Sequence, residues 1–290
     1  NYSLGTPGNP AKITNCQELQ DVRNHLRWHY TIENDIDCSE TRSWNNGAGF
    51  IAIANNAGFT GKIDGQNHII SNLYMSSDSS RGVFGQMQGT ITGLNLKDVD
   101  FACYSTYCGV LTNVNFGTIE KSSITGKLAC SGKCGGFASQ NSGTISQSWA
   151  DLEISSLDSG YGGPGYAGLI AGQSYSGTIS NCYAKGQIVA SQGGGLVGLN
   201  ESSNISNSYS VAKVGNSSQW QDANGGLIGW QYQGASQTNS YWNKETSGRN
   251  IMCGSTQYNS PESCNDDNGL TDAQSKRWAS YQGFDFEGIW

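Results

Sequence analysis

The sequence has few charged residues and no long apolar run. Charged residues make up 13% of its 290 residues and apolar residues 36%, which is too little for a large spherical core. No stretch approaches the roughly 18 apolar residues of a membrane-spanning helix, so we expect no membrane span. The net charge is −7, without a stripe of Lys and Arg. Nucleic acid and anionic membranes are therefore disfavoured as partners.

Histidine is scarce, which limits the acid–base chemistry available. The three histidines, His25, His29 and His68, all lie in or near the N-terminal segment. A polysaccharide lyase needs a base such as Lys, Arg or His, and a hydrolase needs two or three carboxylates about 5 to 9.5 Å apart. Asp151 and Glu153 alternate and would share a strand face, but we interpret them as a solvated surface pair. The sequence therefore assigns no catalytic residue.

Glycine, in contrast, is abundant, with 40 residues, and marks an internal repeat. In six segments a Gly precedes an apolar pair, at spacings of 27, 27, 32, 27 and 31 residues. Five segments carry an Ile nine to eleven residues later, and the sixth has Gln237 and Thr238 there. The glycines are Gly82, Gly109, Gly136, Gly168, Gly195 and Gly226, and the isoleucines are Ile91, Ile119, Ile145, Ile179 and Ile205.

This repeat predicts a stack of short strands. Apolar runs of two or three residues, broken by Gly, Asn and Ser, are typical of strands and turns. A coil of about 27 residues can hold three short strands, which pair with those of the next coil about 4.8 Å away. We predict an all-β fold, a right-handed parallel β-helix solenoid of about seven coils. Six apolar side chains are expected to stand in register inside it: Val83, Val110, Phe137, Leu169, Leu196 and Leu227.

The whole chain, 1–290, is predicted to be one β-helix domain. The coils occupy 58–245, between an N-terminal arm and cap (1–57) and a C-terminal cap (246–290). Within 15–27, Leu19, Val22 and Leu26 fall on one face of a helix that Thr14 or Asn15 can cap. Such a helix would cover the open edge of the first coil. The C-terminal segment has Thr271 and Gln274 at capping-box spacing and ends in an aromatic run expected to pack onto the last coil.

Eight of the nine cysteines form local pairs, which predicts disulfides and an oxidising compartment. Zinc is the alternative, and only Cys130 and Cys134 come near its ligand spacing. Cys182 is left over, at the step where neighbouring repeats have Ser, and is predicted to be a buried free thiol. An intermolecular disulfide is its alternative role. The predicted pairs are Cys16–Cys38, Cys103–Cys108, Cys130–Cys134 and Cys253–Cys264.

Aromatic residues supply the candidate binding surfaces. Trp149, Tyr183, Tyr209 and Tyr241 recur at one step of successive repeats. If they point outward they form a ladder suited to stacking on sugar rings; if they point inward they fill the core, which is the interpretation we favour.

Two insertions between coils carry aromatic residues of their own. Tyr161, Tyr166 and Trp220 lie at these insertions and are the predicted ligand-binding residues. The alternative is that these loops fold back over the flank. No cofactor is predicted. Ca²⁺ is a weak candidate at Asn265–Gly269, which lacks EF-hand spacing, and at Asp35 and Asp37.

The strings GGLVGLNESSNISNSYS and GGLIGW…NSYWNKETSG resemble the GLUG repeat of secreted bacterial surface proteins. The segments before and after them resemble those that usually flank this repeat, so the resemblance covers residues 13–290. It implies a secreted β-helix and favours adhesion. It supplies no shared catalytic residue.

We therefore expect a secreted, non-catalytic adhesion or binding module at the cell surface, contacting glycans or partner proteins. One alternative is a polysaccharide lyase or glycoside hydrolase acting on acidic polysaccharide. The other is a structural subunit of an extracellular fibre or layer, formed by self-association. Asn1 in place of Met leads us to expect a processed or trimmed chain.

Overall fold

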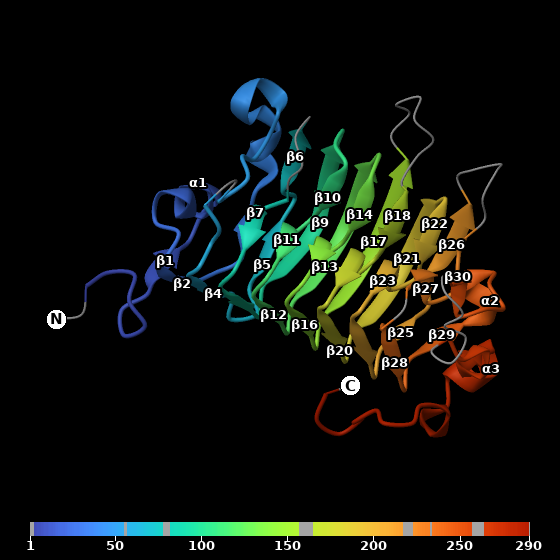
Figure 1. Ribbon diagram of the computed structural model, residues 1–290. Coiled ribbons are helices and arrows are strands. Elements are labelled where there is room, and N and C mark those ends of the chain that lie inside the picture. The colour runs from blue at the N-terminus through green and yellow to red at the C-terminus, as the bar shows by residue number, and fades with distance from the viewer. Residues whose placement is uncertain are drawn as a thin grey trace.

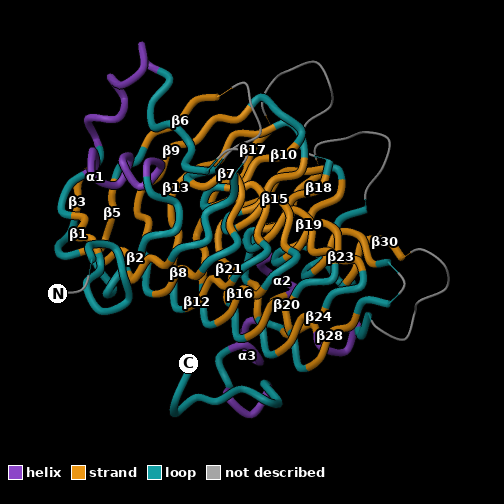
Figure 2. The backbone as a smooth tube through the Cα atoms, turned by 60° about the vertical axis from the view of Figure 1, so that its left-hand side comes forward, coloured by secondary structure: helices purple, strands orange, loops and turns teal. Residues whose placement is uncertain are grey.

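The chain forms a parallel β-helix, as predicted. The computed structural model describes residues 3–54, 57–77, 82–156, 165–216, 223–232, 234–256 and 264–289. Its strands build a 9-stranded, a 4-stranded, a 7-stranded and an 11-stranded sheet that run along the stack (Figure 1). Strands of successive rungs lie side by side (Figure 2). Among the described residues, no helix is long and apolar enough to cross a membrane.

The nine-stranded sheet carries the predicted isoleucine ladder. Each of its middle strands points one Ile into the interior, where Ile91, Ile119 and Ile145 are 0% exposed and pair in register. The ladder ends at Gln237, which pairs with Ile205 and has a buried amide without a hydrogen-bond partner. The strands are β1 (Ala11–Ile13), β2 (His29–Ile32), β4 (Lys62–Asp64), β8 (Thr90–Thr92), β12 (Thr118–Glu120), β16 (Thr144–Ser146), β20 (Thr178–Ser180), β24 (Asn204–Ser206) and β28 (Ser236–Thr238).

Seven rungs of this sheet, β4 to β28, fall within 58–245, in agreement with the expected seven coils. The strands β1 and β2 add two rungs inside the segment assigned to the arm and cap. At the other end, two strands after residue 245 extend other sheets. The stack is therefore longer than the repeat that predicts it.

The seven-stranded and four-stranded sheets correct the predicted register. Thr112 pairs with Phe84 and Ala138, so Leu111 stands in the column of Val83 and Phe137, in place of Val110. By the same pairing, Ile170 replaces Leu169. The strands are β7 (Phe84–Met87), β11 (Thr112–Asn115), β15 (Ala138–Asn141), β19 (Ala171–Tyr175), β23 (Val197–Glu201), β27 (Ile228–Gln231), β30 (Cys253–Thr256), and β10 (Tyr107–Gly109), β14 (Lys133–Gly135), β18 (Tyr166–Gly168), β22 (Gln192–Gly194).

Paired glycines explain this error of one residue. Gly109 pairs with Gly135, the first glycine of Gly135–Gly136, whereas the sequence alignment used the second. A Cβ at Gly135 would collide with the Ala138 carbonyl oxygen, so this corner requires glycine. Both apolar residues that follow Gly109 are buried. Burial therefore could not indicate which of the two belongs to the column.

The eleven-stranded sheet has nine strands in its main order, and β6 and β26 pair with β9 and β21 beside it. In β17 the burial alternates, so that Ala150, Leu152 and Ile154 face the interior. The alternating residues of this sheet therefore point outward. Its strands are β3 (Ile36–Asp37), β5 (Ile69–Ser71), β6 (Tyr74–Ser77), β9 (Asn95–Cys103), β13 (Ser123–Cys130), β17 (Trp149–Ser156), β21 (Tyr183–Ala190), β25 (Tyr209–Ser210), β26 (Lys213–Asn216), β29 (Tyr241–Asn243) and β31 (Gly269–Leu270).

Two polar ladders hold the turns of successive coils together. In the first, the buried Asn115 donates from Nδ2 to Asn141 Oδ1 at 2.8 Å, and Asn200 donates to Gln231 Oε1 at 3.1 Å. In the second, each serine hydroxyl donates to the carbonyl two residues back and accepts the backbone N–H of the preceding coil; Ser208 is an example. Because buried polar groups are costly without partners, these ladders fix the register of the coils.

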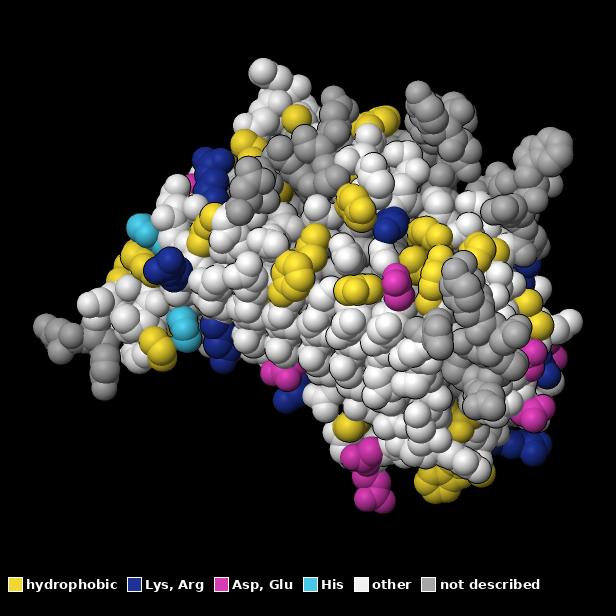
Figure 3. All heavy atoms as spheres, viewed as in Figure 1, with side chains coloured by type: hydrophobic (Ala, Val, Ile, Leu, Met, Phe, Trp, Pro, Cys, Tyr) yellow, Lys and Arg dark blue, Asp and Glu magenta, His cyan; other side chains and the backbone are white. Residues whose placement is uncertain are grey.

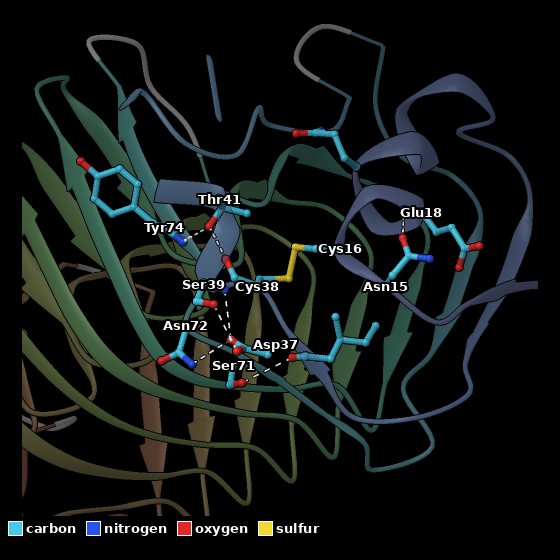
Figure 4. The surroundings of a disulfide bond; sticks show 12 residues. Asn15, Cys16, Glu18, Asp37, Cys38, Ser39, Thr41, Ser71, Asn72 and Tyr74 are labelled. Carbon is cyan, nitrogen blue, oxygen red and sulfur yellow. Dashed lines mark hydrogen bonds between the residues drawn. A yellow bond between two sulfur atoms is a disulfide. The ribbon is translucent and has the colours of Figure 1, made fainter. Parts of the chain in front are cut away.

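The N-terminal cap is a short helix tied to the stack by a disulfide. The helix α1 (Cys16–Asp21) begins after Asn15, whose side chain accepts the Glu18 N–H at 3.0 Å. A 3-10 turn, Val22–Asn24, follows, so the helix is shorter than the expected 15–27. Figure 4 shows how the disulfide of Cys16 reaches Cys38, beside Asp37, which accepts hydrogen bonds from Ser39 and Asn72.

The C-terminal cap contains two single-turn helices. The helix α2 (Lys244–Ser247) follows β29 directly, and α3 (Asp272–Ser275) follows β31. Thr271 and Gln274 form the predicted capping box of α3. After α3 the chain turns back beneath the stack (Figure 1). This return places the last described residues beside the eleven-stranded sheet.

Candidate ligand-binding cleft

The repeated aromatic residues form an outward-facing ladder. Trp149 pairs with Tyr183, Tyr183 with Tyr209, and Tyr209 with Tyr241, across four rungs of the eleven-stranded sheet. Trp149 is 43% exposed, whereas its neighbour Ala150 is fully buried. The interpretation of these residues as core filling is therefore wrong. The turn before the strand had left the direction of the side chains open.

The C-terminal segment covers one end of this ladder. The Tyr281 ring lies edge-on to Tyr209 and Tyr241, with ring centroids 5.1 and 5.4 Å apart. Phe284 packs against Tyr241, and the Gln282 N–H donates to Tyr241 Oη at 3.0 Å. Tyr209 and Tyr241 are consequently 8% and 6% exposed. The aromatic run thus packs on the side of the stack, rather than on its end.

A cleft of about 730 Å³ lies between the uncovered part of the ladder and this segment. Trp149 and Tyr183 form its floor, and aromatic and aliphatic side chains of the C-terminal segment form the opposite wall. Amide and charged side chains stand at its rim. The lining residues are Gln147, Ser148, Trp149, Asp151, Asn181, Tyr183, Lys185, Tyr209, Ser275, Tyr281, Phe284, Phe286 and Ile289.

The charged side chains in and beside the cleft form ion pairs. Lys185 Nζ lies 3.1 Å from Asp151 Oδ2, and Lys127 Nζ lies 3.8 Å from Glu153 Oε2. The expected surface pair Asp151 and Glu153 is therefore divided between two lysines. Among the described residues that line the cleft, Asp151 is the one carboxylate. The cleft thus does not present the two carboxylates that glycoside hydrolysis uses.

Tyr183 is a hydrogen-bond donor in this cleft. Burial, together with the neighbouring Tyr209 and Asp151, raises the pKa of Tyr183 to about 12. The phenol therefore stays protonated at physiological pH. It can donate to a ligand hydroxyl or carboxylate but is a poor general base.

The residues predicted to contact a ligand do not gather in this cleft. Tyr166 begins β18, and its ring lies 5.8 Å from Lys133 Nζ, which also lies 5.2 Å from the ring of Tyr107. Tyr161 and Trp220 lie outside the described residues. Figure 3 shows a face on which hydrophobic side chains are scattered with few charged ones among them. A binding role for these three aromatics stays a prediction.

The cysteines pair as their spacing predicts. Disulfides join Cys16–Cys38, Cys103–Cys108, Cys130–Cys134 and Cys253–Cys264. Cys182 is a free, fully buried thiol in the serine ladder, and its Sγ contacts the Ser180 carbonyl oxygen at 3.3 Å. Burial raises the pKa of the Cys182 thiol to about 12. A nucleophilic role would require an accessible thiolate, which this position does not provide.

In the candidate calcium loop, Asn265–Gly269, side-chain oxygens already accept hydrogen bonds from backbone N–H groups. Asn265 Oδ1 accepts the Asp267 N–H at 3.0 Å, and Asp266 Oδ1 accepts the Met252 N–H at 2.7 Å. At the other candidate, Asp35 and Asp37, Asp35 Oδ1 accepts the Ile69 N–H at 2.9 Å. Within the part of the chain that the structure describes, no three His, Cys, Asp or Glu side chains come together as metal ligands.

One coil of the stack matches a known family model. The model described as the GLUG motif matches residues 163–189, which include β18, β19, β20 and most of β21. The chain carries a GLUG motif. In this structure the GLUG motif therefore corresponds to about one turn of the β-helix, and it includes Tyr183 of the cleft.

Similar proteins share part of the sequence or the fold. Halomucin of Haloquadratum walsbyi is 32% identical over 146 residues, which cover 46% of this chain and 2% of Halomucin. A protein described as an immunoglobulin A1 protease from Bacteroides ovatus has a TM-score of 0.69 at 21% identity, covering 83% of this chain and 77% of that one. A structure named IgA1 protease has a TM-score of 0.63 at 20% identity, covering 80% of this chain and 19% of that one. At such identities the two structures show the β-helix fold alone.

Proposed function

We propose that this chain is a non-catalytic, extracellular binding module whose cleft binds a carbohydrate. The observation that carries the proposal is the composition of the cleft. Trp149 and Tyr183 offer flat aromatic faces to the apolar C–H face of a sugar ring. Gln147, Asn181 and Asp151 stand around them with amide and carboxylate groups that suit sugar hydroxyls.

The charged residues favour binding over catalysis. Asp151 is paired with Lys185, so neither group is poised as a free acid or base. Glu153, at the next outward position of β17, does not line the cleft and is paired with Lys127. A hydrolase or lyase would use convergent groups around one bond, as the alternative function requires.

The disulfides and the relatives support an extracellular, cell-surface location. Four disulfides in one chain are typical of an oxidising compartment. The GLUG motif and the similarity to Halomucin agree with this location. An adhesive role follows naturally, because a rigid stack can present the cleft away from the surface that carries it.

A glycan array followed by titration calorimetry tests the proposal. Trp149→Ala and Tyr183→Ala should each weaken glycan binding about tenfold or more, which corresponds to about 1.4 kcal/mol. Phe116→Ala is the matched control, because Phe116 is 51% exposed and does not line the cleft. Absence of any bound glycan, or an equal loss in the control, would overturn the proposal. New reducing ends or unsaturated products on incubation with acidic polysaccharides would overturn its non-catalytic part.

A further inference from the structure

Trp149 lines a second hollow, which lies on the side of its ring toward the N-terminal coils, whereas the cleft lies on the other side of the ring. This hollow measures about 380 Å³. At the ladder position, the earlier rungs have Ile69, Asn95 and Ser123 in place of aromatic rings. Because these side chains are shorter than the aromatic rings, the surface of the sheet is recessed at these rungs. The indole of Trp149 therefore lies between this hollow and the cleft. The hollow is lined by Asn67, Ile69, Asn95, Leu96, Lys97, Ser123, Thr125 and Trp149.

The cleft and the hollow lie on one straight row of the sheet. From Ile69 to Tyr183 the row crosses five rungs in register. Four strand spacings of about 4.8 Å give a length of about 19 Å parallel to the stack axis. Such a row can hold a ligand considerably longer than one sugar ring.

Hydrogen-bonding side chains flank the row on both sides. On one side Asn67, Gln147 and Asn181 occupy turns with φ of 62°, 49° and 52°. These turns hold their amides at the edge of both depressions. On the other side the flank includes Lys97 and Thr125 in the hollow, and Asp151 and Lys185 in the cleft.

The backbone beneath the row favours a glycan over a peptide. The strands β9, β13 and β17 each pair with neighbours on both sides, so their N–H and C=O groups are used within the sheet. A peptide that binds by adding a strand needs a free sheet edge. A ligand that crosses these strands can be held only by side chains, through stacking and hydrogen bonds to hydroxyls.

We infer that the bound glycan is an unbranched chain that lies along the stack axis and occupies both the cleft and the hollow, across Trp149. This inference rests on the proposed function and specifies its ligand. Trp149 contacts the middle of the chain. Lys97 and Thr125 contact the sugars on one side of it, and Tyr183 and Asn181 those on the other.

Oligosaccharides of increasing length provide the test. Linear β-1,4-glucan, chitin and polygalacturonate series, from dimer to hexamer, are titrated against the full chain by calorimetry. The series that binds should gain about tenfold or more in affinity from dimer to hexamer. Lys97→Ala combined with Thr125→Ala, which removes two hydrogen-bonding side chains of the hollow, should reduce the affinity for the hexamer to that for the dimer. Lys62→Ala, on the outer face of the nine-stranded sheet, is the control.

The outcomes separate the two proposals. Equal affinity for dimer and hexamer, or a gain that survives in the double variant, overturns the extended track but keeps a carbohydrate-binding cleft. Failure of every series and of the array to bind overturns the proposed function, and the track with it. Circular dichroism confirms that the double variant is folded, since both changes lie on the outer face.

Discussion

Replacing Gln237 by Ile should stabilise the protein. The five isoleucines from Ile91 to Ile205 fill the interior of the nine-stranded sheet, and Gln237 follows at the last rung. Both the Oε1 and the Nε2 atoms of Gln237 are buried without a hydrogen-bond partner. An Ile at this position would extend the ladder onto Ile205 and remove an unsatisfied amide.

The two contributions to this gain act in the same direction. An unsatisfied buried polar group costs about 1–3 kcal/mol. Full burial of an Ile side chain contributes about 1.5–3 kcal/mol. Because position 237 is only half-buried, an Ile there would gain part of this free energy. We expect the free energy of unfolding to rise by about 2 kcal/mol. The reverse change one rung earlier, Ile205→Gln, should lower it by about 3 kcal/mol or more, because Ile205 is fully buried.

Urea unfolding followed by circular dichroism measures these changes. The midpoint should shift upward for Gln237→Ile and downward for Ile205→Gln, with little change in the m-value. Thr238→Val is the control, since Thr238 is exposed and should change stability by no more than about 0.5 kcal/mol. If Gln237→Ile leaves stability unchanged or lowers it, then the interior of the last rung is not the apolar site described above.

Two further outcomes follow from the perturbed side chains. Iodoacetamide at pH 8.5 should leave Cys182 unmodified in the folded protein and alkylate it after unfolding; mass spectrometry of the native protein showing labelled Cys182 would contradict its burial. Burial raises the pKa values of Tyr183 and Tyr281 above the unfolded value near 10, so the stability that they contribute is complete below pH 10 and is lost as the pH rises above it. The melting temperature should therefore fall more steeply above pH 10 in the native protein than in Tyr281→Phe, and identical alkaline profiles would refute this account.

The features that the sequence predicts best are those marked by one residue type that recurs once in each coil. One isoleucine per coil marks the nine-stranded sheet, so its ladder and the parallel β-helix follow from spacing alone. Local cysteine pairs are similarly direct, because three pairs are 4 to 11 residues apart and Cys16 and Cys38 bracket the N-terminal segment. The columns at Val110 and Leu169 are wrong by one residue, since two adjacent apolar residues and paired glycines satisfy the same pattern.

The cleft could not be predicted, because it depends on a distant contact. Tyr241 and Gln282 are 41 residues apart when the C-terminal segment returns to the ladder. The aromatic ladder and the aromatic run were each visible in the sequence, but nothing in either indicates that they meet. The orientation of the ladder was also open, because left-handed turn residues such as Gln147 and Asn181 precede it and reset the alternation of side chains.

The register of neighbouring coils also makes the length of this molecule adjustable. Ile119 pairs with Ile91 on one side and Ile145 on the other, so excision of Thr118–Gly143 would bring Ile91 directly onto Ile145. The same cut removes both Cys130 and Cys134 and leaves no orphaned thiol. Tandem duplication of such a unit in the gene would therefore lengthen the stack, and its loss would shorten it, while the strands of the remaining coils still pair in register. The length of the protein beyond the cleft could thus change in steps of one coil during evolution.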